Sequence, residues 1–228
     1  MIFSFKRVRT IILAMVLIFA ASFAGTDYYL RGHLYYTKRA VNFIIRNTWQ
    51  SVFPPSGPVH LYVRIEADQD YRRIHPDWKT HIPALMDSVD ERFAEEFDIH
   101  FIILGLSGWD RPEELRDYSA MLIYAEKKID RQSAQILVLM TGKDEESGRA
   151  AHWVDVGIAH YMGNCVIVGD DFQLLHELGH LFGTIDYPAG SPGFDSESIY
   201  SYKYADRTDK IDPANRGRIW RNKYRVMW

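Results

Sequence analysis

The sequence has a single cysteine, Cys165, among 228 residues, so an intramolecular disulfide bond is excluded. This cysteine lies in the apolar segment 165–168, where we expect a buried core residue. An excess of charge of one sign is also missing, since 27 lysines and arginines face 30 aspartates and glutamates. The slightly acidic balance does not favour nucleic acid as a partner. Near the C terminus, a solvated helix face is predicted for Arg216, Arg218, Arg221, Lys223 and Arg225.

The apolar stretch near the N terminus is shorter than the about 20 residues that a membrane-spanning helix needs. It covers residues 11–24 and follows three basic residues, Lys6, Arg7 and Arg9. Residues 1–25 are therefore predicted to be a secretory signal peptide or an uncleaved membrane anchor, and both interpretations stay open. Either one places the rest of the chain outside the cytoplasm, secreted or membrane-anchored, because positive charge tends to stay inside.

Residues 26–57 are predicted to be a stem or linker, and residues 58–228 a single domain. The proline-rich stretch 54–58 marks the boundary, and about 170 residues after it suffice for a sizeable core. Within the stem, the segment 37–46 is predicted to form a helix that packs on the domain or, alternatively, lies along a membrane surface. The membrane is thus a partner if the N-terminal segment is not cleaved.

Within the domain, apolar periodicity predicts strands and helices in alternation. The predicted strands cover 60–65, 100–104, 135–140, 153–160 and 165–168. The predicted helices cover 82–97, part of 112–128, the region around 173–182, and a C-terminal segment with Pro213 at its first position.

One stretch contains residue types that bind metal ions and transfer protons. Residues 176–186 have the sequence His-Glu-Leu-Gly-His-Leu-Phe-Gly-Thr-Ile-Asp. On a helix, residues four apart share a face, so His176 and His180 can bind the same metal ion while Glu177 lies beside it. Asp170, followed three residues later by Gln173, predicts a capping box at the start of this helix.

The third ligand must come from beyond the helix. Gly183 suits a left-handed turn that reverses the chain, and Asp186 then follows six residues after His180. A carboxylate oxygen is an acceptable zinc ligand. The alternative is that Asp186 is a solvated carboxylate and that Glu197 completes the site.

This stretch resembles the metzincin zinc metalloproteases, whose pattern is H-E-x-x-H-x-x-G-x-x-H, with Asp186 at the last position as in the snapalysin type. Residues 198–202, Ser-Ile-Tyr-Ser-Tyr, resemble the turn of that superfamily, with Tyr200 where methionine is usual. The resemblance, which extends to the matrixins, implies an α+β fold. Its parts are a mixed twisted sheet with an antiparallel edge strand, an active-site helix, a Met-turn-like turn and a C-terminal helix.

The resemblance also implies roles around the metal. Tyr202 would hydrogen-bond the developing oxyanion. Gly157, Ile158, Ala159 and His160 would form an edge strand that pairs with an extended substrate, although an ordinary edge strand has the same pattern. His152 and His160, with Asp155, could hold a structural zinc, against the alternative of solvated or hydrogen-bonded side chains.

The sequence therefore predicts a zinc-dependent endopeptidase that acts on protein or peptide substrates. One catalytic Zn²⁺ is held by His176, His180 and Asp186, and Glu177 is the general base. Two alternatives remain: an inactive or zinc-structured binding module at the membrane surface, and a hydrolase of cell-wall peptides with the same site. Glu177 argues against the module, because a site kept for structure needs no base.

Overall fold

The computed structural model describes residues 56–115, 117–142, 157–161 and 163–225. The predicted signal or anchor, nearly all of the predicted stem, and the candidate ligands His152 and Asp155 lie outside these ranges. Within them, no helix combines the length and the apolar character needed to cross a membrane. The division of the chain at residues 25 and 57 stays a prediction.

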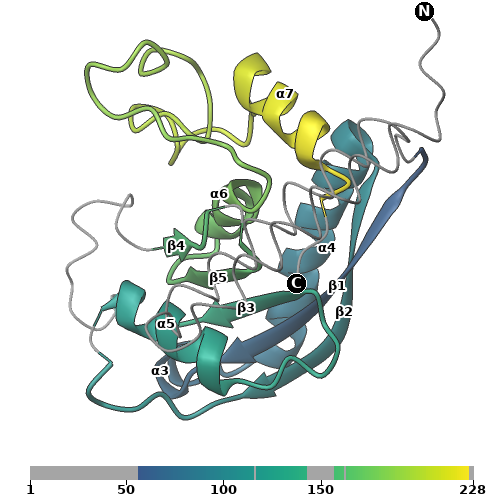
Figure 1. Cartoon of the computed structure of the whole chain (residues 1–228). Helices are drawn as coiled ribbons and strands as arrows, with labels where there is room; N and C mark the ends of the chain where they lie inside the picture. Colours follow the sequence, from purple (N-terminus) through teal and green to yellow (C-terminus); the bar gives the residue numbers. More distant parts are fainter. Residues whose placement is uncertain (1–55, 116, 143–156, 162, 226–228) are drawn as a thin grey trace, which may run out of the picture. The chain divides into compact units, whose positions relative to one another are not determined.

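Five strands of the described chain form one mixed sheet in the order β2–β1–β3–β5–β4, and Figure 1 shows its twist. They are β1 (Val59–Ala67), β2 (Ile99–Gly108), β3 (Ile136–Met140), β4 (Gly157–Ala159) and β5 (Cys165–Val168). The first four strands in this order run parallel, and β4 pairs antiparallel with β5 at the edge. The predicted mixed sheet with an antiparallel edge strand is confirmed. Of the predicted strand 153–160, the described part is β4.

The burial of each strand follows its place in the sheet. All residues of β3 and β5 are buried, as expected for central parallel strands covered on both faces. Strand β1 alternates in its first half, where Leu61 and Val63 point into the core and Tyr62 is 41% exposed. The buried Cys165 confirms the expected core position of the only cysteine.

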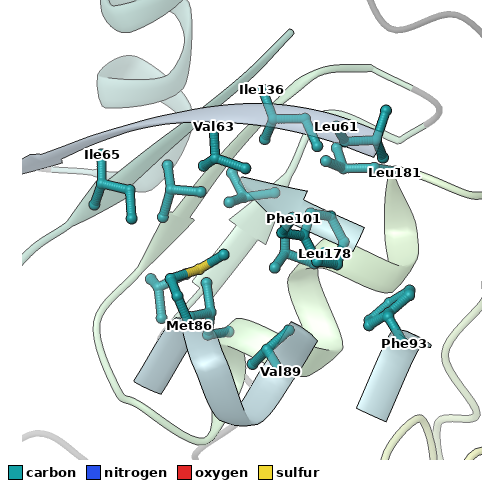
Figure 2. Close-up of a cluster of buried hydrophobic side chains, with 14 of the residues drawn as sticks. Leu61, Val63, Ile65, Met86, Val89, Phe93, Phe101, Ile136, Leu178 and Leu181 are labelled. Carbon is teal, nitrogen blue, oxygen red and sulfur yellow. The ribbon is translucent and has the colours of Figure 1, made fainter. Parts of the chain in front are cut away.

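Helix α4 (Trp78–Phe97) covers one face of the sheet. Its buried side chains recur at intervals of three and four residues, and they are Ile82, Met86, Val89, Phe93 and Phe97. Figure 2 shows some of them facing side chains of the sheet and of the segment that follows β5. Helix α5 (Tyr118–Lys128), within the predicted range 112–128, packs Met121 and Ala125 on the opposite face. The short helix α3 (Gln69–Ile74) was not predicted.

Helix α6 (Gln173–His180) follows β5 and contains both histidines of the motif. The predicted capping box is wrong: Phe172 is the N-cap, and no side chain caps the helix. Asp170 instead accepts a hydrogen bond from the N–H of Phe172, 3.0 Å away. An aspartate readily forms such a local turn, so its carboxylate is used before the helix begins.

Helix α7 (Pro213–Asn222) is the predicted C-terminal helix, with Pro213 in its first turn. The prediction of a solvated basic face is wrong for Lys223, which is 3% exposed. Its ammonium donates to the carbonyl oxygen of Phe97 at 3.0 Å, at the end of α4. A cation is favoured there because the last carbonyls of a helix carry partial negative charge. Arg216 and Arg221 are exposed as predicted.

Candidate metal centre

Three side chains from α6 and from the segment that follows it converge. His176 and His180, one turn apart on α6, place their Nε2 atoms 3.0 Å from each other. Oδ1 of Asp186 lies 3.2 Å from Nε2 of His176 and 3.4 Å from Nε2 of His180. Within the described part of the chain, these three residues are the group whose ligand atoms could hold a metal ion, all within 4.8 Å of one another.

Backbone carbonyls fix which ring nitrogens face this point. Nδ1 of His176 lies 2.9 Å from the carbonyl oxygen of Ile199, and Nδ1 of His180 lies 3.0 Å from that of Thr184. A carbonyl oxygen only accepts hydrogen bonds, so each Nδ1 carries a hydrogen, and Nε2 is the ring nitrogen left to bind a metal ion. If a metal displaced the proton from Nε2, two nitrogen lone pairs and the carboxylate of Asp186 would point at one ion. This donor set fits zinc.

The chain reaches Asp186 through the predicted left-handed turn, since Gly183 has φ of 84°. Oδ1 of Asp186 is buried and has no hydrogen bond of good geometry with the described residues. Burial raises the pKa of Asp186, but the contacts with His176 and His180 outweigh it and hold the pKa well below its usual range. Burial lowers the pKa of His180, and Asp186 more than reverses this, to about 9. The carboxylate is therefore ionised and paired with the histidines.

Glu177 is buried beside the histidines, and burial raises its pKa above the usual value. Its Oε2 has no hydrogen-bond partner among the described residues. The edge strand lies directly against it, because a Cβ added to Gly157 would be 2.6 Å from Oε1 of Glu177. A carboxylate so placed, with a free oxygen, is suited to take a proton from a group that enters between β4 and the histidines.

Tyr200 forms the floor under the histidines. Its ring centroid lies 5.0 Å from that of His176 and 5.6 Å from that of His180, and its side chain is fully buried. Tyr200 therefore lies where the similar turn of the metzincins has its methionine. Burial raises its pKa far above the usual value, so the phenol is neutral.

The family model described as metallo-peptidase family M12 matches residues 59–208, which span the sheet, the three converging side chains and the turn. The chain belongs to this family. As a member, it is a metallopeptidase, and the predicted relation to metzincin-type zinc metalloproteases is confirmed. Among curated proteins none matches.

Two solved structures resemble the metallopeptidase. Archaemetzincin from Methanopyrus kandleri aligns over 73% of this chain and 97% of its own, with 14% identity and a TM-score of 0.49. A chain from the structure of a chaperone-substrate complex aligns over 61% of this chain, with 13% identity and a TM-score of 0.47. This chain spans 26% of the length of the latter.

The two candidates for the third ligand lie in different surroundings. Asp186 meets both histidines, whereas Glu197 is 58% exposed and pairs with Lys210 at 2.7 Å. Tyr202 is half-buried, and its N–H donates to the carbonyl oxygen of Tyr187 at 3.2 Å, which places it beside the Asp186 segment. Its contact with an oxyanion stays a prediction.

The residues expected to bind substrate occupy the sheet edge. Gly157, Ile158 and Ala159 form β4, which pairs with β5 on one side. His160 follows the strand, and its Nδ1 lies 2.5 Å from Oε1 of Glu126 on α5. This hydrogen-bonded state was the alternative to a structural zinc for His160. Pairing of β4 with a substrate stays a prediction.

Sequence reasoning missed the groups that orient the ligands in the metallopeptidase. The carbonyls of Ile199 and Thr184 are backbone groups, which any residue type could supply. No sequence pattern therefore predicts their role. The network around Asp212, the residue before Pro213, was also missed. Its carboxylate accepts from the hydroxyls of Tyr187 and Ser198, and it joins the ligand segment to the turn.

Proposed function

We propose that this metallopeptidase is a zinc-dependent endopeptidase that hydrolyses peptide bonds of protein or peptide substrates outside the cytoplasm. The observation that supports this most is the convergence of His176, His180 and Asp186 next to a buried glutamate with a free oxygen. A purely structural metal site has no use for Glu177. The apolar N-terminal stretch after basic residues supports the extracytoplasmic location.

The roles of the side chains follow from their chemistry. His176, His180 and Asp186 would hold the metal, which when bound supplies a Lewis acid that polarises a peptide carbonyl and makes water more acidic. Glu177 takes the proton from the attacking water and returns it to the leaving amine. The water adds directly to the carbonyl carbon, so no covalent enzyme intermediate forms.

The edge of the sheet would bind the substrate. Among the strands of the described residues, β4 has β5 as its one neighbour, so its other side can hydrogen-bond an extended peptide through backbone groups. Gly157, within this strand, adjoins Glu177, so a peptide added here passes over the base. Tyr202 would donate a hydrogen bond to the oxyanion that forms.

The decisive experiment incubates the full chain, loaded with zinc, with an unfolded protein substrate. Glu177→Gln is the matched control, because it keeps the size of the side chain and removes the base. We expect fragments from the wild type, and none from the variant or after chelation, while the variant still binds one zinc. Internal fragments would show an endopeptidase, and the N-terminal residue of the mature chain would decide between signal and anchor.

Other outcomes identify the alternatives. Zinc binding by both forms with cleavage of neither would count for the binding module. Cleavage of cell-wall peptide cross-links but not of unfolded proteins would identify the cell-wall hydrolase. Equal cleavage by wild type and Glu177→Gln would contradict the role of Glu177.

A further inference from the structure

A groove with a volume of about 1000 Å³ lies next to the metal centre, between α4, the start of α6 and the segment 197–210. Two of its residues connect it to the ligands. Leu175 directly precedes His176, and Ile199 holds the ring of His176 through its carbonyl oxygen. We call it the acidic groove, for the charges described below. None of the three ligands lines it, so it is separate from the site already described.

The floor of the acidic groove is apolar. Val89 and Ile199 are buried in it, and Leu85 and Leu175 are half-buried. Phe172, which also lines the groove, is 78% exposed, the largest exposed fraction among the exposed large apolar side chains of the described residues. An apolar floor with an uncovered aromatic beside it is typical of a surface that binds a partner.

The walls of the acidic groove carry an excess of negative charge. Six acidic residues and three basic residues line it, and these are Glu91, Glu95, Asp171, Glu197, Asp206 and Asp209 against Arg92, Arg207 and Lys210. The basic residues have partners: Lys210 pairs with Glu197, and Arg207 pairs with Asp206. Arg92 pairs with Glu96, which does not line the groove.

Two of the acids stand out on α4. Glu91 and Glu95 are both exposed, and neither forms an ion pair with any described residue. Residues four apart on a helix are neighbours about 6 Å apart along its axis, where two like charges repel each other. A cationic partner would relieve this repulsion, so the charge pattern is complementary to a basic ligand.

We propose that the acidic groove docks a segment of the substrate that carries an apolar residue together with lysine or arginine at alternate positions. This rests on the proposed peptidase function and names the substrate class. In an extended peptide, alternate side chains lie on one side about 6.6 Å apart, which matches the spacing of Glu91 and Glu95 along α4. The apolar residue fits the floor beside Leu175 and Phe172. Ile199 lines the groove and contacts His176. A substrate chain held for cleavage could therefore reach the groove with a second segment.

The first test measures docking without cleavage. The zinc-loaded full chain with Glu177→Gln is titrated with fluorescent peptides that share one apolar core and carry lysine, glutamine or glutamate at two alternate positions. We expect the lysine peptide to bind about tenfold more tightly than the glutamine peptide, and the ratio to fall with added salt. Equal affinities for the three peptides would overturn the proposal.

Charge reversal shows where the preference arises. The double change Glu91→Lys and Glu95→Lys is expected to make the glutamate peptide the tightest ligand. The matched control is Glu113→Lys with Glu114→Lys, two exposed acids outside the groove, which should leave the lysine preference unchanged. If both double variants lose the preference equally, the net charge of the protein is responsible and the docking site is refuted.

A second variant tests the apolar part. Phe172→Ala changes an exposed side chain, so the protein should fold, and affinity for all three peptides is expected to fall about fivefold. Unchanged affinity for the peptides would refute the role of Phe172 in docking. Because these measurements use an inactive variant, failure to dock is distinct from failure of the proposed function. Cleavage of an uncharged substrate tests the latter.

Discussion

At the scale of residues, Tyr200 and Gly179 form a complementary pair beneath His176 and His180. The hydroxyl of Tyr200 lies 1.7 Å from the position that a Cβ on Gly179 would take, and Cζ lies 2.9 Å from it. A glycine inside a helix is otherwise unfavourable by roughly 0.5–1 kcal/mol relative to alanine. Gly179 is therefore required by the tyrosine that replaces the usual methionine of the turn.

Gly179→Ala should lower the free energy of unfolding of the zinc-free protein by about 1–3 kcal/mol, because the core is overpacked. In the Tyr200→Met background the same change should cost clearly less, since methionine is flexible and has no hydroxyl. Urea unfolding of the four proteins, with chelator present, gives the coupling energy, expected to be on the order of 1 kcal/mol or more. Additive effects would contradict the pairing.

Gly157 has a similarly close relation to Glu177, the proposed general base. Gly157→Ala would place a methyl group 2.6 Å from Oε1 of Glu177, so the carboxylate must move. We expect peptidase activity to fall about 10²-fold, the cost of a misplaced catalytic group, while one zinc is still bound. The control is Ile158→Val on the same strand, whose side chain packs on the α5 side of the sheet. Equal losses in both variants would point to damage to β4 rather than to Glu177.

At the scale of elements, the N-terminus of α7 holds the ligand segment and the turn together. Asp212 is 7% exposed, caps α7 and accepts from the hydroxyls of Tyr187 and Ser198. Asn215, one turn later, exchanges hydrogen bonds of 2.9 and 3.0 Å with the backbone of Ile185. The residue before Asp186 is thus fixed by a helix that begins 27 residues after Asp186.

Asp212→Ala should cost about 2–4 kcal/mol, since it removes a helix cap and leaves two hydroxyls without their acceptor. It should also weaken zinc binding about tenfold, because the support of Asp186 is loosened. Asp117→Ala is the matched control, as Asp117 caps α5, a different helix, and accepts from the N–H of Ala120. This control should cost about 1 kcal/mol and leave zinc affinity unchanged. A normal zinc affinity in Asp212→Ala would refute the supporting role.

At the scale of the whole molecule, two kinds of interaction hold the domain. The sheet and α4 share a large apolar core, in which the side chains of Ile65, Ile82 and Phe93 are fully buried. The segment that runs from Gly183 to Asp212 has little regular structure and is joined by polar contacts. A metal that ties Asp186 to α6 therefore stabilises the part of the fold with the smaller core.

Zinc at about 100 times its dissociation constant should raise the free energy of unfolding by about 2.7 kcal/mol. His180→Ala and Asp186→Ala should remove most of this gain, whereas Glu197→Ala should keep it. Thermal unfolding with zinc or with chelator measures the shift for each variant. A shift that survives in Asp186→Ala and disappears in Glu197→Ala would reverse the assignment of the third ligand.

The sequence alone determined what depends on neighbours along the chain. His176, Glu177 and His180 share one helix, so the pitch of that helix fixes their relation before any tertiary contact forms. The left-handed turn at Gly183, the four parallel strands and the helix after Pro213 followed from residue type and periodicity. The prediction of a capping box was wrong because the carboxylate of Asp170 accepts from the N–H of Phe172. The prediction that Lys223 is solvated was wrong because the end of α4 lies beside it in space.

Tertiary structure decided what joins distant segments. The sequence left Asp186 and Glu197 as alternative ligands, and the path of the chain brings only Asp186 to the histidines. The carbonyls of Ile199 and Thr184, the fit of Gly157 against Glu177 and the acidic groove depend on how α4, α6 and the turn pack. Backbone acceptors are chemically alike in all residues, and packing distances are set by side chains far apart in the chain. No local pattern can encode them, so they appear only when the chain is folded.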